Sequence, residues 1–273
     1  MILLSAGLGI GIAQPVEVTT PAPEQALSEN AVPSPAENDH LVTLDTRPGV
    51  SVQIYYMKRV GATATVVLLP GGAGDLGMKN DLPGSKNFLV RSRDYFASNG
   101  FNVAVIGKPS DKYELGFGTR VSSEHLEDLF LIVKYLNKDS GLPVWLIGTS
   151  KGTISATAAA ISFGKKELAG IVLTSSVTSV TKEGAVPGQN LGAIDIPVLV
   201  VHHELDECKI CVPGDASLIT KRLTHALIKK EIYVNGGANP QGDPCEALHW
   251  HGYIGMEKKV VDLISDWIMN PVP

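Results

Sequence analysis

The sequence lacks the features of a nucleic-acid-binding or membrane-spanning protein. It contains no run of lysine and arginine and carries a net charge of −5 over 273 residues, so we expect no nucleic-acid partner. No apolar run after the first residues approaches the roughly 20 residues of a membrane helix, so stable insertion into a bilayer is not expected either. Internal repeats are also absent. The length instead suits one large globular domain.

The first 38 residues differ in composition from the rest. The opening stretch MILLSAGLGIGIAQP is apolar and ends in small residues near Ala13, as a secretory signal does, although no lysine or arginine precedes it. Residues 14–38 then carry five prolines among alanine, glutamate, threonine and serine, a composition that cannot build a core. We therefore predict a signal remnant and a flexible tail over 1–38, a folded domain over 39–273, and a periplasmic or secreted location.

Strand and helix patterns alternate along the folded domain. A hairpin over 41–46 and 51–58, turning at Pro48-Gly49, is followed by mostly apolar strands at 65–69, 101–106, 144–147, 171–173, 198–201 and 231–234. Helices are predicted at 87–98, 123–137, 153–163 and 258–268, with one more after Pro213. This order predicts an α/β fold, a mostly parallel, doubly wound sheet of about eight strands with helices on both faces. Ligands then bind at the carboxyl ends of the strands.

A candidate nucleophile lies between one of these strands and the next helix. Gly148-Thr149-Ser150-Lys151-Gly152 matches G-x-S-x-G, which is a weak motif alone. Here the strand VWLI precedes it and the helical segment TISATAAAI follows it, and this context is typical of a nucleophile elbow that exposes the serine hydroxyl. A plain glycine-rich turn is the structural alternative.

A second glycine-rich loop follows the strand at 65–69. It reads Gly71-Gly72-Ala73-Gly74, without the spacing of a phosphate-binding loop. Backbone N–H groups of Gly72 or Ala73, together with that of Lys151, are expected to form an oxyanion hole.

The acid and the base of a triad would follow the serine in that order. Asp206 lies a few residues past the strand at 198–201 and is preferred to Glu204, which is too close to the strand, and to Glu207, which suits the surface. For the base, His251 is preferred because Gly252 follows it in the loop before the last helix; His249 is the alternative. His225 is placed in the helix after Pro213 with a structural role, and His202 and His203 are expected to shape the acid's loop.

The segments LLPGGAG, VWLIGTSKG, VLVVHHELDEC and HWHGY, in this order, resemble the α/β-hydrolase superfamily over residues 41–273. The chain is especially similar to exported bacterial members that share an NFLVRSR-type helix, a KPSD-type loop and a cysteine beside the acid. One departure is Pro70, where many relatives have histidine. The resemblance implies that residues 39–273 are a catalytic domain without a large lid, although 177–195 could form a short flap.

The resemblance further implies a serine hydrolase that cleaves a small carboxylic ester through an acyl-enzyme, without a cofactor or metal. A peptidase or thioesterase with the same triad stays open, as does a non-catalytic binding protein on this scaffold. A metal-dependent hydrolase would have to use His202, His203, Glu204 and Asp206, whose spacing suits no common site. The oligomeric state is left open.

The three cysteines are Cys208, Cys211 and Cys245. If the triad is right, the acid and base loops are neighbours, and a Cys208–Cys245 disulfide would join them and leave Cys211 free. The rival is a redox or zinc pair of Cys208 and Cys211, which lacks a second C-x-x-C. Several further polar residues near strand ends are expected to do buried salt-bridge and capping work rather than bind substrate: Arg91, Arg93, Asp111, Arg120 and His125.

Overall fold

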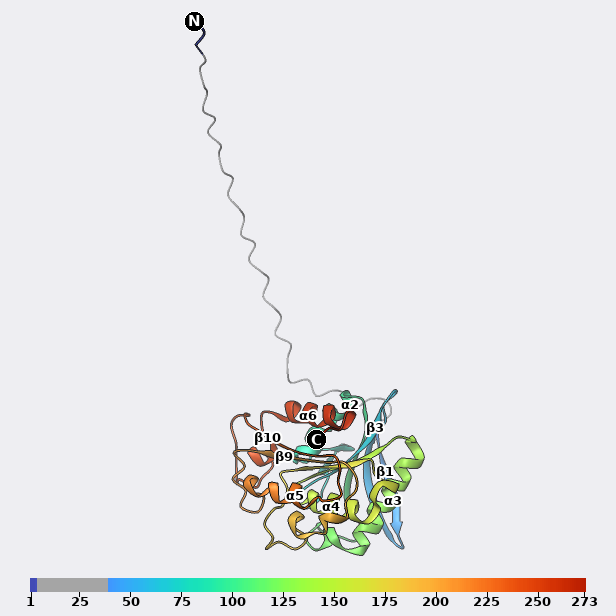
Figure 1. The fold of residues 1–273 in the computed structure, drawn as a ribbon. Coiled ribbons are helices and arrows are strands. Elements are labelled where there is room, and N and C mark those ends of the chain that lie inside the picture. The colour runs from blue at the N-terminus through green and yellow to red at the C-terminus, as the bar shows by residue number, and fades with distance from the viewer. Residues whose placement is uncertain (4–38) are drawn as a thin grey trace. The chain divides into compact units, whose positions relative to one another are not determined.

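The computed structural model describes residues 1–3 and 39–273, and the fold below is that of residues 39–273 (Figure 1). The predicted signal and proline-rich segment lie outside the described residues except for the first three, so they stay predictions. Among the described helices, none combines the length and the hydrophobicity needed to cross a bilayer.

Eight strands form one sheet in the order β1-β2-β6-β3-β7-β8-β9-β10. The β1–β2 and β2–β6 pairs are antiparallel, and all the other pairs are parallel, which confirms the predicted mostly parallel sheet. A separate two-stranded hairpin, β4–β5, lies between β3 and β6 in the chain. The strands are β1 (Asp39–Arg47), β2 (Val50–Met57), β3 (Ala64–Leu69), β4 (Met78–Lys79), β5 (Leu82–Pro83), β6 (Phe101–Pro109), β7 (Val144–Thr149), β8 (Gly170–Thr174), β9 (Val198–His203) and β10 (Lys229–Val234).

Helices cover both faces of the sheet (Figure 1). Side chains of α3 (Ser123–Ser140), α4 (Gly152–Phe163) and α5 (Ser217–Arg222) share one apolar core with the strands. Side chains of α1 (Phe88–Arg91), α2 (Arg93–Ser98) and α6 (Glu257–Met269) share the other. In α3, helical spacing of apolar residues directs one face onto the sheet; these residues are Leu129, Ile132, Val133 and Leu136. The alanine-rich α4 is instead buried along almost all of its length. Six short 3-10 turns complete the elements: Thr119–Val121, Gly164–Lys166, Val186–Gly188, Leu191–Ala193, Pro213–Asp215 and Trp250–Gly252.

Three sequence predictions of local structure need correction. The helix predicted over 87–98 is divided at Ser92, whose φ and ψ of −99° and 4° end α1 and begin α2. His225 does not lie in a helix, because α5 ends at Arg222 and His225 bonds to the Gly192 carbonyl instead. The segment 177–195 is not a flap over most of its length, since Val177, Val186, Leu191 and Ile194 are fully buried, although Val180 is exposed.

Candidate active site

Ser150 lies at the sharp turn between β7 and α4. Its φ of 52° is in the left-handed region, which costs energy for a residue with a Cβ. Its N–H donates to the Thr174 carbonyl at 3.0 Å, and this hydrogen bond ties the turn to the end of β8. The turn also needs glycine at its end, because a Cβ on Gly152 would lie 2.0 Å from the Leu69 carbonyl oxygen. The strand, the strained serine and the helix therefore have the geometry expected of a nucleophile elbow.

The carboxylate of Asp206 lies in the loop after β9 and is almost completely buried. Its Oδ1 accepts a hydrogen bond from the Cys208 N–H at 2.9 Å, and its Oδ2 lies 2.8 Å from Nδ1 of His251. The competing carboxylates, Glu204 and Glu207, are both exposed, and Glu204 bonds to the side-chain amide of Asn235. Of the three candidates, Asp206 is thus the one that meets a histidine.

The backbone around His251 is held in several places. Its carbonyl accepts from the Ser175 hydroxyl at 2.8 Å. Two residues on, the Tyr253 hydroxyl donates to the Val201 carbonyl at 2.9 Å and fixes the loop against β9. The alternative base, His249, packs edge-on against Trp250, with ring centroids 5.1 Å apart, and no hydrogen bond joins it to Asp206 among the described residues. The ring that Asp206 orients is therefore that of His251.

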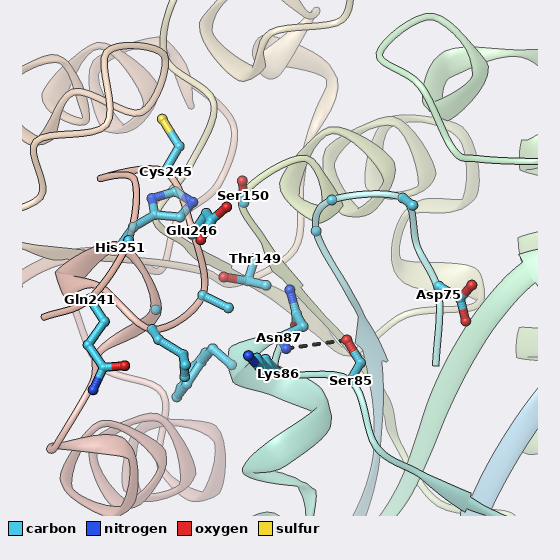
Figure 2. A pocket seen from close by; sticks show the side chains of 18 residues that line it. Asp75, Ser85, Lys86, Asn87, Thr149, Ser150, Gln241, Cys245, Glu246 and His251 are labelled. Carbon is cyan, nitrogen blue, oxygen red and sulfur yellow. Dashed lines mark hydrogen bonds between the residues drawn. The ribbon is translucent and has the colours of Figure 1, made fainter. Parts of the chain in front are cut away.

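Ser150 and His251 line one pocket of about 670 Å³ (Figure 2). Nε2 of His251 is buried and has no hydrogen-bond partner among the described residues, so this nitrogen is available as an acceptor. No hydrogen bond joins it to the serine hydroxyl; such contacts are often long before a substrate is bound. The structure thus brings the predicted serine, acid and base to one place, without a direct hydrogen bond between Ser150 and His251.

Three backbone N–H groups on the two loops predicted to form an oxyanion hole have no acceptor among the described residues. Within residues 39–273, the N–H groups of Gly72, Ala73 and Lys151 donate no hydrogen bond. Gly72 and Ala73 line the pocket that holds Ser150. An anion that develops on a carbonyl bound at Ser150 could accept bonds from these groups.

The predicted disulfide between Cys208 and Cys245 is present, and it joins the acid's loop to the segment just before His251. Cys211 is free and fully buried, and burial raises the pKa of its thiol. Cys208, Cys211 and His251 place ligand-type atoms within 4.8 Å of one another. With Cys208 bonded to Cys245, only two of these atoms can bind a metal, which is too few for a structural zinc site.

Sequence reasoning missed part of the pocket wall. The polar side chains that it did not single out come from the loop after β3, the segment before α1 and the segment before the last 3-10 turn: Asp75, Lys86, Asn87, Gln241 and Glu246. Nothing in the local pattern of these loops marks them, because the residues that meet in the pocket are far apart in the sequence. The apolar part of the wall includes Phe88, Ala247 and Leu248.

Three of the polar residues assigned to structural work form ion pairs, the third being Arg93, which pairs with Asp94 at 3.9 Å. Arg91 bonds to Glu257 at 2.9 Å and also to the Gly252 carbonyl, beside His251. Asp111 pairs with Arg47 at 3.2 Å. Arg93 donates to the Val90 carbonyl at 2.8 Å. Arg120, by contrast, forms no ion pair with any of the residues that the structure describes.

Two buried histidines make the folded protein sensitive to acid. Burial lowers the pKa of His202 to about 4 and that of His125 to about 3, from 6.5. His202 Nε2 accepts a bond from the Ser176 N–H at 3.0 Å, which a proton there would break. The unfolded chain therefore binds more protons than the folded one below about pH 6.5, and stability falls as the pH falls.

We expect the free energy of unfolding to be lower at pH 5 than at pH 7 by about 2 kcal/mol for each histidine. Urea denaturation at the two pH values measures it. His202→Gln keeps an acceptor for Ser176 and should remove about half of the difference. An unchanged difference in both His202→Gln and His125→Gln would show that other groups cause the effect.

No protein-family model and no curated protein matches the sequence, but solved structures match the fold. A homologue of α/β serine hydrolases from Coxiella burnetii is 13% identical with a TM-score of 0.60, and the match covers 85% of this chain and 99% of that one. An esterase of Pyrococcus furiosus is 16% identical with a TM-score of 0.62, over 85% and 92% of the two chains. A Xanthomonas campestris α/β serine hydrolase without a lid is 14% identical with a TM-score of 0.57, over 86% and 93%. The chain therefore has the α/β-hydrolase fold.

Proposed function

We propose that the protein is a serine hydrolase that cleaves carboxylic esters through an acyl-enzyme on Ser150. The observation that carries the proposal is the meeting, in one pocket, of a strained serine and a histidine whose other nitrogen lies 2.8 Å from a buried carboxylate. Esterases and serine hydrolases among the solved structures of the same fold support it.

The mechanism follows from these positions. His251 Nε2 takes the proton of the Ser150 hydroxyl, and the serine oxygen forms a bond to the acyl carbon. The carbonyl oxygen becomes an anion beside the free N–H groups of Ala73 and Lys151. The C–O bond to the alcohol then breaks, and His251 passes its proton to the leaving oxygen. Water attacks the acyl-enzyme by the same steps and releases the acid, while Asp206 holds the imidazole in the productive tautomer.

The pocket favours an accessible substrate of modest size. The segment between β8 and β9 is packed into the core rather than inserted as a lid, so closure over a long acyl chain is not built into this part of the chain. The wall combines Phe88 and Leu248 with charged side chains at Lys86 and Glu246. We infer an ester with a short apolar acyl group and a polar leaving group; a thioester or peptide bond would use the same machinery.

A fluorophosphonate probe tests the proposal on the wild-type protein. We expect one adduct, found by peptide mapping on the peptide that contains Ser150, and a parallel loss of p-nitrophenyl acetate hydrolysis. Cys211 lies close to His251 but is fully buried with a protonated thiol, so no adduct is expected there.

If the folded protein takes no label and hydrolyses no ester, the result contradicts the proposal and favours a binding protein on this scaffold. An adduct on another residue would instead identify that residue as the nucleophile. Rates on matched ester, thioester and peptide substrates then decide which acyl bond is preferred.

A further inference from the structure

Arg120 is buried without a negative partner. Only 1% of its surface is exposed, and no acidic side chain among the described residues bonds to it. Burying an unpaired charge is costly, and burial lowers the pKa of this guanidinium to about 9. A purely structural position would be filled more cheaply by an apolar side chain, so the contacts of the guanidinium need an explanation.

Three of its four hydrogen bonds go to two places next to the proposed nucleophile, and the fourth stays within its own part of the chain. Nη2 donates to the Pro70 carbonyl at 3.0 Å and, in a longer contact, to the Gly72 carbonyl at 3.4 Å. These carbonyls belong to the loop after β3 that carries the free N–H groups. Nη1 donates to the Ser155 hydroxyl at 3.1 Å, and Ser155 lies on α4, the helix that follows Ser150. Nε donates to the Leu115 carbonyl at 3.1 Å.

The bond to Gly72 bears on the direction of a neighbouring donor. In a trans peptide, the C=O and the N–H point to opposite sides, and the Gly72 C=O shares its peptide with the Ala73 N–H. When Arg120 holds the carbonyl on the inner side, the Ala73 N–H must point the other way, and Ala73 lines the pocket. A hydrogen bond to the carbonyl also polarises the peptide and strengthens its N–H as a donor.

Two further carbonyls of the loop are held by backbone groups. The Gly71 carbonyl accepts from the Gly74 N–H at 3.1 Å, and the Ala73 carbonyl accepts from the Leu115 N–H at 2.9 Å. Arg120 supplies the bonds that the backbone does not. Through Ser155 it also connects this loop to α4, whose N-cap residue is Lys151.

We propose that Arg120 is a positioning residue that fixes the two halves of the oxyanion hole, the loop after β3 and the start of α4, relative to each other. The inference rests on the proposed hydrolase function and adds to it a residue that touches neither substrate nor reacting atoms. Its loss should weaken binding of the transition state and leave binding of the ground-state ester unchanged.

Arg120→Met tests the inference with three constants: kcat and KM for p-nitrophenyl acetate, and Ki for a trifluoromethyl ketone, which forms a tetrahedral adduct with an oxyanion. Removing one direct oxyanion donor lowers kcat by about 100- to 1,000-fold, so loss of its support should cost about 30- to 100-fold. We expect Ki to rise by the same factor while KM stays within about 3-fold. Arg120→Lys keeps the charge but not the planar fork, and should lose about 3- to 10-fold in kcat.

Arg47→Met is the matched control. Arg47 is also largely buried and bonds to Asp128 and Asp111, away from the pocket, so its loss should lower thermal stability and leave kcat and Ki unchanged. An Arg120→Met protein with wild-type kcat, or with a fall in kcat that Ki does not follow, would overturn the inference. If Arg120→Met does not fold, the same comparison on Arg120→Lys decides. Wild-type protein without probe labelling or turnover would instead defeat the hydrolase proposal itself.

Discussion

Ser150→Ala and His251→Ala are each expected to lower kcat for ester hydrolysis by about 10⁶-fold, and the double variant is expected to lose no more than either alone. In the proposed mechanism the serine becomes a nucleophile only when Nε2 of His251 takes its proton, so removing either side chain abolishes the function of both. Steady-state rates with p-nitrophenyl acetate, measured with active-site titration of the wild type, provide the comparison.

A residual rate above that of water is also expected in these variants. The free N–H groups of Gly72, Ala73 and Lys151 stay in place and can still stabilise an anion formed by direct attack of water, which supports roughly 10³- to 10⁴-fold over the uncatalysed reaction. Additive losses in the double variant would mean that the two side chains act separately. His249→Ala is the matched control, since this buried histidine does not bond to Asp206, and it should keep most of the activity.

Most of the fold could be predicted because its signals are local. Continuous apolar runs such as TVVLL mark strands buried on both faces, and their order along the chain implies parallel pairing. The division of the helix at Ser92 could not be seen, since apolar spacing continues across the break. The early end of α5 depends on contacts made after folding, such as the bond between His225 and the Gly192 carbonyl.

The residues of the candidate site also differ in how far the sequence alone could identify them. Ser150 is marked by its own neighbours, because the two glycines and the flanking strand and helix are adjacent in the sequence. Asp206 and His251 follow from chain order once the serine is known. Arg120 could not be assigned from sequence, because its partner Pro70 lies 50 positions away and an arginine at the end of a polar loop usually pairs with an acid.

Asp206→Asn is expected to lower kcat by about 10⁴-fold although the side chain keeps its size. Oδ1 of Asp206 accepts from the Cys208 N–H at 2.9 Å, so the asparagine carbonyl must take this position to avoid placing two donors together. Its NH₂ group then faces Nδ1 of His251, where the carboxylate oxygen now lies at 2.8 Å.

That NH₂ group can only donate, so it forces the His251 proton onto Nε2, the atom that receives the Ser150 proton in the proposed mechanism. The imidazole is held in the wrong tautomer, and the imidazolium loses its nearby negative charge. Kinetics of Asp206→Asn beside Glu204→Gln and Glu207→Gln, with thermal unfolding to verify the fold, provide the test. Full activity in Asp206→Asn, or a comparable loss in either exposed glutamate variant, would reassign the acid. The geometry predicts that only Asp206 matters, because of the three carboxylates it alone bonds to His251, and its bond to the Cys208 N–H fixes which way a replacement amide must point.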